Sequence, residues 1–230
     1  MLKRALNLAL VLLSFSTLAH AGPYSTVLVY GDSISDNGNL FAATGQPGAP
    51  YYQGRRSDGP VAVEQLAAAL GVPLRDFAWI GATTGIGNYA DGGTTTTAGL
   101  IALPGMQVQL AATRGLLNPY LASGLFVVWG GANDFLAPSP LDLTPLAVVN
   151  RAISNELGIV ASLELLGAQN ILVPGMPDLG LTPYFQRLGP VAAAQASLLS
   201  DVFNAAIQSN LPAGVPVSYT HLTLPTILRV

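Results

Sequence analysis

Two short polar stretches carry the groups that acyl transfer requires. Ser33 lies in YGDSISDNGN, directly after an apolar run at residues 26–30. Asn133 lies in GGAND, directly after another apolar run at residues 125–129. A serine hydroxyl on a tight turn is a candidate nucleophile, and an asparagine amide can donate a hydrogen bond to a developing oxyanion. Each stretch is also typical of an ordinary turn or helix cap, so neither alone decides the function.

The elements that must position these residues alternate along the chain. Short β-branched runs predict strands at residues 26–30, 74–80, 125–129, 170–173 and 215–219. Helical periodicity predicts helices at residues 59–70, 106–121, 144–166 and 190–210. In the third helix the apolar stripe comprises Leu146, Val149, Ile153, Leu157, Val160 and Leu163, and Gly167 is its expected end.

This alternation predicts one α/β domain, a three-layer α/β/α sandwich around a parallel five-stranded sheet. In the strand order 2-1-3-4-5, the first and third strands are neighbours at the point where the order reverses. The residues that follow them, Ser33 and Asn133, then face one crevice at the carboxyl ends of the strands.

The composition excludes several classes of protein. Of the 230 residues, 50% are hydrophobic and 9% are charged, which is not the composition of a disordered chain. The net charge is −3 and there is no basic stripe, so no nucleic-acid partner is expected. The chain has no cysteine, which excludes disulfides and cysteine-based metal sites. A Gly- and Thr-rich stretch at residues 85–99 predicts a surface loop.

The N-terminus is typical of a secretory signal peptide. Lys3 and Arg4 precede an apolar stretch at residues 5–18, and Ala19-His20-Ala21 forms a small-x-small cleavage pattern. The stretch is too short and too polar at its end for a stable membrane span. We therefore expect residues 1–21 to be removed and the protein to be secreted or periplasmic.

The polar stretches and their surroundings resemble the GDSL, or SGNH, hydrolases. GDSISDNGN resembles the first signature of that family. Further elements of its lipase/esterase branch resemble, in order, GRRSDGPVAVEQLA at 54–67, DFAWIGAT at 76–83, GGAND at 130–134, LGAQNILVPGMPDLGLTP at 166–183 and FNAAI at 203–207. The resemblance runs from about residue 26 to about residue 217 and implies the flavodoxin-like sheet of this family.

The resemblance also implies roles for individual residues. Ser33 would be the nucleophile, and its backbone N–H, the N–H of Gly81 and the side chain of Asn133 would hold the oxyanion. The nucleophile turn would be stabilised by Asp32, Asp36 and Asn39.

Two departures from the family pattern lie close to Gly81. Asp76 stands where the family usually has Asn, and Ile80 stands where it usually has Gly. Both departures bear on the backbone near Gly81, and Gly85 is the alternative donor.

The general base is the missing part. The family takes its acid and base from an Asp-x-x-His element near the C-terminus, but this chain has only two histidines. His20 lies in the predicted signal peptide, and the residue three positions before His221 is Ser218 rather than Asp. The final stretch, SYTHLTLPTILRV, resembles the translation of a sequencing adapter. We therefore expect a hydrolase domain at residues 22–217 that is incomplete at its C-terminus, a non-native tail at residues 218–230, and an inactive chain. The competing hypothesis is that His221 is native and acts as the base.

The leading functional hypothesis is an exported serine esterase or lipase that forms an acyl-enzyme on Ser33. It would need no metal and no organic cofactor, and its substrate would be a small-molecule, lipid or acylated-glycan ester. Tyr51 and Tyr52 are candidates to stack on a sugar or to line an acyl slot, although local packing explains them equally simply. The alternatives are a catalytically dead glycan- or lipid-binding module on the same fold and acyl transfer to an acceptor other than water.

Overall fold

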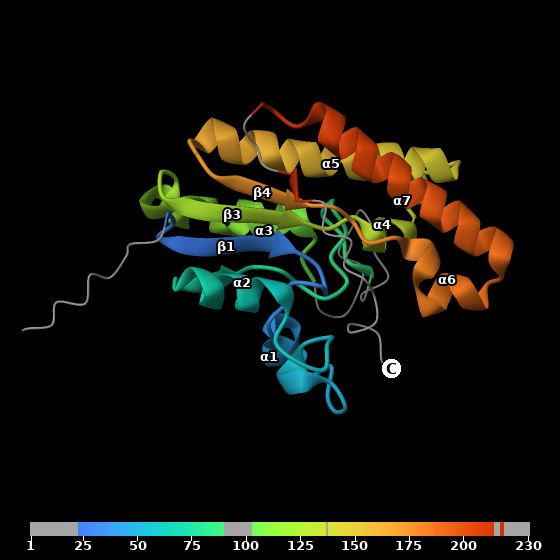
Figure 1. Cartoon of the computed structure of the whole chain (residues 1–230), viewed down its shortest axis with the longest axis horizontal. Helices are drawn as coiled ribbons and strands as arrows, with labels where there is room; N and C mark the ends of the chain where they lie inside the picture. The colour runs from blue at the N-terminus through green and yellow to red at the C-terminus, as the bar shows by residue number, and fades with distance from the viewer. Residues whose placement is uncertain (1–22, 90–102, 137, 214–216, 219–230) are drawn as a thin grey trace, which may run out of the picture.

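A parallel five-stranded sheet forms the centre of the molecule. The computed structural model describes residues 23–89, 103–136, 138–213 and 217–218 (Figure 1). The strands lie side by side in the order β2-β1-β3-β4-β5 and every neighbouring pair is parallel. Their bounds are β1 Thr26–Gly31, β2 Leu74–Asp76, β3 Gly124–Trp129, β4 Ile171–Pro174 and β5 Val217–Ser218. The predicted α/β class and strand order are confirmed.

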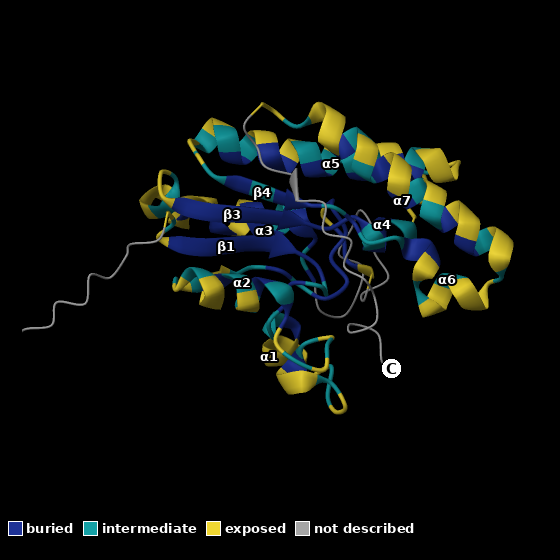
Figure 2. Ribbon diagram, viewed as in Figure 1, coloured by how far each residue is buried: buried dark blue, intermediate teal, exposed yellow. Residues whose placement is uncertain are grey.

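Helices cover both faces of this sheet and complete the three layers (Figure 1). Along β1, Leu28 and Tyr30 point to the core cluster that includes α3 (Met106–Thr113), α5 (Pro145–Leu166) and α7 (Pro190–Asn210). Val27 and Val29 point to the opposite cluster, which α2 (Ala62–Leu70) covers. Because side chains alternate along a strand, a strand buried on both faces must be apolar throughout. Figure 2 accordingly shows β1 and β3 as buried along their length.

The long helices begin and end where local signals predict. The Thr144 side chain accepts a hydrogen bond from the N–H of Ala147 at the start of α5, with Pro145 at the first helical position. Gly167 ends α5 in the left-handed region, at φ 99°. Three short helices, α1 (Asn39–Thr44), α4 (Ala132–Leu136) and α6 (Pro183–Arg187), escaped prediction because they are too short for a helical period to be recognised.

Two predicted elements are shorter in the structure. The strand predicted at 74–80 ends at Asp76, whose carboxylate accepts the N–H of Ala78 and turns the chain. The helix predicted at 106–121 ends at Thr113, and two 3₁₀ turns, Arg114–Leu116 and Asn118–Tyr120, follow it. Gly115 and Pro119 lie in these turns, and both residue types disfavour a continued α-helix.

The predicted stripe of α5 is confirmed at Val149, Val160 and Leu163, and Ile153 and Leu157 pack against the core while partly buried. Leu146 is 53% exposed, whereas the buried face comprises Val148, Val149, Ala152, Glu156, Ile159, Val160 and Leu163. The prediction is wrong for Leu146, and it missed the alanine and the glutamate of the buried face, because hydrophobic periodicity does not mark these two residues as core.

Three further predictions lie largely or wholly outside the described residues. These concern the signal peptide at 1–21, most of the loop at 85–99, and the tail at 218–230 apart from Ser218.

Candidate active site

The turn after β1 presents Ser33 at the carboxyl end of the sheet. The backbone N–H groups of Ser35 and Asp36 donate to the carbonyl oxygen of Asp32 at 3.1 and 2.9 Å. The N–H of Ile34 donates to Asp32 Oδ1 at 3.0 Å. Within the described residues, the N–H of Ser33 makes no hydrogen bond, and the residue is partly exposed. Hydrogen bonds therefore close the turn around Ser33, and among the described residues the N–H of Ser33 itself has no partner.

Asp36 connects this turn to the segment that contains Gly81. Its Oδ1 accepts the N–H groups of Gly38 and Asn39 at 2.7 and 2.6 Å, and its Oδ2 accepts the N–H of Ile80 at 2.8 Å. Asn39 in turn donates from Nδ2 to the carbonyl oxygens of Asp76 and Ala78 at 3.0 and 2.9 Å, beside the same segment. These bonds fit the expected role of Asp36 and Asn39 in stabilising the nucleophile turn.

Gly81 has the conformation and the free donor expected of an oxyanion-hole residue. Its φ of 83° lies in the left-handed region, which favours glycine. Ile80 before it is held by Asp36, and the carbonyl of Ala82 after it accepts from Asn133. In the part of the chain that the structure describes, the buried N–H of Gly81 makes no hydrogen bond. A buried N–H without a partner is rare in folded proteins.

Asp76, one of the two departures from the family pattern, is held by two backbone donors. Asp76 accepts the N–H of Asn37 through Oδ2 and that of Ala78 through Oδ1, both at 2.9 Å. Burial raises the pKa of Asp76 to about 8, although both N–H donors oppose that shift. Gly85, the alternative donor, accepts the N–H of Gln107 at 3.1 Å, which ties it to the start of α3.

Asn133 joins the three segments although they are far apart in the sequence. It is buried in α4, and its Nδ2 donates to the carbonyl oxygen of Ala82 at 2.9 Å and to Asp32 Oδ2 at 3.3 Å. The first bond reaches the Gly81 segment and the second reaches the Ser33 turn. The structure thus brings the segments of Ser33, Gly81 and Asn133 together.

Asp134, the residue after Asn133, makes further contacts that hold the Gly81 segment and the Asn133 helix in place. Asp134 accepts the N–H of Thr84 through Oδ2 and its hydroxyl through Oδ1, both at 2.9 Å. Arg151 of α5 contacts Asp134 Oδ1 at 2.8 Å and Asp142 Oδ2 at 2.8 Å. We call the linked side chains of Thr84, Asp134 and Arg151 the Asp134 clip. It attaches the Gly81 segment and the Asn133 helix to α5.

The carboxyl groups of the site are buried enough to change their acidity. Burial raises the pKa of Asp32 to about 7, the N–H of Ile34 lowers it, and the nearby Asp134 and Asp36 raise it further. Burial also raises the pKa of Asp134, while Thr84 and Arg151 lower it. The ionised forms of Asp32 and Asp134 are therefore disfavoured beside the expected oxyanion position.

Sequence reasoning missed Gln109, which fixes the end of β1. Gln109 is buried in α3, and its Nε2 donates to the carbonyl oxygen of Gly31 at 2.8 Å, while its Oε1 accepts the N–H of Gly31 at 3.0 Å. Gly31 lies two residues before Ser33. A glutamine between Met106 and Leu110 on the buried side of a helix was the available signal.

Replacing Gln109 by Leu is expected to lower the free energy of unfolding by about 2 kcal/mol. The apolar side chain leaves the buried N–H of Gly31 unpaired. Urea denaturation measures the loss, and Gln107→Leu is the matched control on the same helix. Gln107 is only partly buried and bonds one side chain, Asn155, so its loss is expected to be about 1 kcal/mol or less. Equal losses in the two variants would contradict the role of Gln109.

The described residues contain no general base of the expected kind. Both histidines, His20 and His221, lie outside them. Within the same residues, no group of three His, Cys, Asp or Glu side chains is arranged to hold a metal ion. Nor does any described helix have the length and apolar character needed to cross a membrane.

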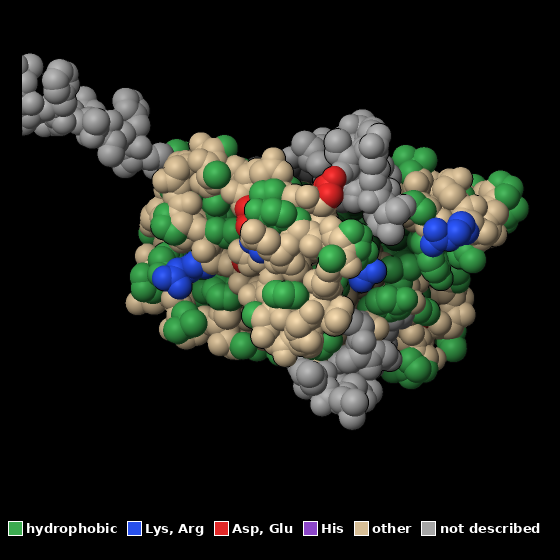
Figure 3. Space-filling model, turned by 90° about the horizontal axis from the view of Figure 1, so that it is seen from below, with side chains coloured by type: hydrophobic (Ala, Val, Ile, Leu, Met, Phe, Trp, Pro, Cys, Tyr) green, Lys and Arg blue, Asp and Glu red, His purple; other side chains and the backbone are tan. Residues whose placement is uncertain are grey.

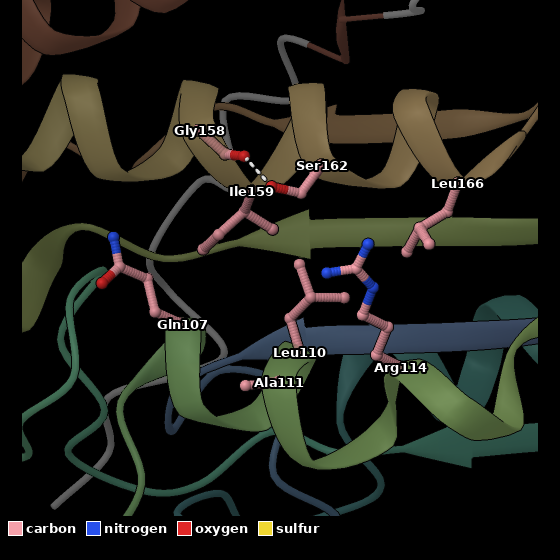
Figure 4. A pocket seen from close by; sticks show the side chains of 8 residues that line it. All are labelled: Gln107, Leu110, Ala111, Arg114, Gly158, Ile159, Ser162 and Leu166. Carbon is pink, nitrogen blue, oxygen red and sulfur yellow. Dashed lines mark hydrogen bonds between the residues drawn. The ribbon is translucent and has the colours of Figure 1, made fainter.

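A separate groove lies between α3 and α5 (Figure 4). Its volume is about 390 Å³, and Leu110 and Ile159 form part of its apolar wall, with Gln107 and Arg114 at its sides. None of Ser33, Gly81 and Asn133 lines it, so it is not part of the candidate site.

Known proteins are similar to this chain over most of its sequence. The profile of the GDSL-like lipase/acylhydrolase family matches residues 27–222. The chain belongs to this family. It is 32% identical to a phosphatidylcholine-sterol acyltransferase of Aeromonas hydrophila, over 81% of this chain and 55% of that protein. It is also 32% identical to the esterase EstA of Pseudomonas aeruginosa, over 96% of this chain and 39% of that protein.

The GDSL-family chain thus spans about half the length of these relatives, or less. Among solved structures it is similar to Est24, a carbohydrate acetylesterase from Sinorhizobium meliloti. The TM-score is 0.47 and the identity 18%, over 84% of this chain and 82% of that chain.

Proposed function

We propose that this protein is an exported serine hydrolase of carboxylic esters with Ser33 as its nucleophile. The observation that carries the proposal is the pair of N–H groups, on Ser33 and Gly81, that have no hydrogen-bond partner among the described residues and whose segments the Asn133 side chain joins. Three donors around one serine are the arrangement that stabilises the oxyanion of acyl transfer. Export rests on the signal-peptide pattern at residues 1–21.

The proposed reaction has two steps. The Ser33 Oγ attacks the ester carbonyl carbon as its proton leaves to a base, and the carbonyl oxygen becomes an oxyanion held by Ser33 N–H, Gly81 N–H and Asn133 Nδ2. The 3.3 Å bond of Asn133 to Asp32 is long and is the one that the oxyanion replaces. The tetrahedral intermediate then expels the alcohol, which takes the proton, and leaves an acyl-enzyme. Water hydrolyses that ester to release the acid and free Ser33.

The base determines how fast this chain reacts. The sequence has no Asp-x-x-His element, and its histidines stand only at positions 20 and 221. We infer that this chain acylates slowly, since the oxyanion hole alone leaves about 10³- to 10⁴-fold acceleration over water. Replacement of His221 by Ala without loss of activity would exclude His221 as the base.

Apolar side chains favour a substrate with an acyl chain. At the end of the molecule where α6 and the start of α7 lie, hydrophobic side chains gather on the face seen in Figure 3. The exposed hydrophobic residues of α6, of the turn after it and of the start of α7 include Tyr184, Leu188 and Val191, which are 47%, 58% and 71% exposed. The carboxyl ends of the strands point toward the same end (Figure 1), so an apolar ester approaching Ser33 would meet them.

Covalent labelling tests the nucleophile directly. An alkyl fluorophosphonate is expected to attach to Ser33 of the full chain, with a mass increase on the peptide that contains it. Ser33→Ala is expected to abolish the labelling, and Ser35→Ala is the matched control because Ser35 is a buried serine of the same turn. Labelling of Ser33→Ala at the parent rate would exclude Ser33 as the nucleophile.

A binding module on the same fold is the second candidate, and the missing base favours it. This candidate predicts no phosphonate labelling and no hydrolysis of p-nitrophenyl esters, with retained affinity for an acylated glycan or a lipid. Labelling of Ser33 would eliminate it.

A further inference from the structure

Glu156 is a buried carboxyl group that the proposed reaction does not use. It lies on the sheet-facing side of α5 and is 1% exposed. Neither carboxyl oxygen has a hydrogen-bond partner within the described residues. Its neighbours at helical spacing, Ala152, Ile159 and Val160, belong to the apolar core. Glutamate is rarely fully buried unless it is paired, so this position requires an explanation.

The charged groups that act on Glu156 are those of the candidate site. Asp134 on α4 and Asp32 after β1 are the two groups whose charge acts on it, and both raise its pKa. The other elements that pack against Glu156 place little further charge near it. The described strand β4, together with α3 and β3, carries no ionisable side chain, Asp201 of α7 is exposed, and Tyr30 of β1 is bonded to Thr113. Burial is the largest cause and raises the pKa of Glu156 well above its usual value.

The same stretch of α5 supports the oxyanion donors. Arg151 contacts Asp134, and Asn155, directly before Glu156, donates from Nδ2 to Thr84 Oγ1 at 3.2 Å. Glu156 therefore lies on the helix that contributes Arg151 to the Asp134 clip. It is within electrostatic reach of Asp134, which follows Asn133, and of Asp32, which Asn133 contacts.

We propose that Glu156 is an uncharged positioning residue of the oxyanion hole, and that loss of its proton at alkaline pH lowers the reactivity of Ser33. The proposal rests on the proposed function. An ionised Glu156 would add a third negative charge to Asp32 and Asp134, and this charge would oppose the one that develops on the oxyanion. It would also draw water toward an apolar core, because a buried carboxylate without a partner is strongly disfavoured.

The experiment compares labelling rates of the full chain over a range of pH. The rate of attachment of an alkyl fluorophosphonate to Ser33 is measured for the parent chain and for Glu156→Gln between about pH 6 and about pH 10. Glutamine has the size of the protonated acid but cannot ionise. The ratio of the variant rate to the parent rate removes the effect of pH on the base and on the probe. Glu164→Gln, a partly exposed glutamate of the same helix, is the matched control.

The expected ratio for Glu156→Gln is near one at acidic pH and rises to about tenfold at the alkaline end. The ratio for Glu164→Gln is expected to stay near one throughout. A flat ratio for Glu156→Gln would overturn the proposal. Glu156→Leu guards against a special effect of the amide, because it also removes the charge and should show the same rise.

A second measurement separates this proposal from the proposed function. The infrared spectrum of the parent chain minus that of Glu156→Gln isolates the carbonyl band of Glu156, because other buried carboxyl groups such as Asp32 and Asp76 contribute to both spectra. This difference band is expected at neutral pH. Absence of that difference band would overturn the uncharged state of Glu156, whatever the labelling shows. If no variant is labelled at any pH, the assignment of Ser33 fails and takes the coupling to reactivity with it, while the band still reports the proton on Glu156.

Discussion

Replacing Asn133 by Ala is expected to slow the reaction of Ser33 with phosphonates and esters by about 10²- to 10³-fold. The amide is the side-chain donor of the proposed oxyanion hole, and it also joins Ala82 to Asp32 by bonds of 2.9 and 3.3 Å. Its loss removes a donor that acts most strongly in the transition state. The rate constant of Ser33 labelling measures the effect without requiring a complete turnover.

Asn170→Ala provides the matched control for this prediction. Asn170 also directs its Nδ2 to backbone carbonyls, those of Ala122 and Gly124 at 3.5 and 3.3 Å, but at the amino end of β3. It is expected to change stability slightly and to leave the labelling rate of the folded protein unchanged. If Asn133→Ala reacts as fast as Asn170→Ala, then Asn133 does not hold the oxyanion.

Replacing Arg151 by Met is expected to lower the free energy of unfolding by about 3 kcal/mol at neutral pH. Arg151 contacts Asp134, whose side chain is 0% exposed, and Asp142, whose side chain is 6% exposed. Removing the cation leaves buried negative charge uncompensated. The expected loss lies at the lower end of the usual range because the Arg151 side chain is itself 20% exposed. Urea denaturation gives the value.

Two variants establish that burial of the partner causes this loss. Arg55→Met breaks an ion pair of 2.6 Å with Glu64, which is 20% exposed, and is expected to cost about 1 kcal/mol or less. Adding Asp134→Asn to Arg151→Met removes the stranded charge and is expected to restore part of the lost stability. A double variant that is no more stable than Arg151→Met would show that the charge of Asp134 is not the cause.

The same substitution tests the Asp134 clip. Asp134 holds Thr84 and follows Asn133. Loss of the Arg151 contact is therefore expected to change the distance between the Gly81 segment and the Asn133 helix. Slower labelling of folded Arg151→Met than of folded Arg55→Met would support this function of the clip.

Local patterns along the chain predicted the main helices and strands and the two stretches that contain Ser33 and Asn133. Alternation of β-branched runs and helical periods is a property of neighbouring residues, so the strands that precede Ser33 and Asn133 and the ends of α5 and α7 could be recognised directly. Parallel strand order then required the two stretches to meet, and the bond between Asn133 and Asp32, 101 residues apart, agrees with this.

The tertiary structure alone decided which polar residues support the site. Gln109, Arg151 and Glu156 each occupy helical positions that periodicity treats as either core or surface. Their roles depend on contacts that a sequence pattern does not show: Gln109 bonds Gly31, 78 residues away, and Arg151 bonds Asp134 and Asp142, 17 and 9 residues away. A buried polar group has meaning only through what it contacts, or, for Glu156, through what it does not contact. The sequence by itself therefore determined the family, the order of the strands and the candidate nucleophile, whereas only the folded chain showed how the segments of Ser33, Gly81 and Asn133 are held together.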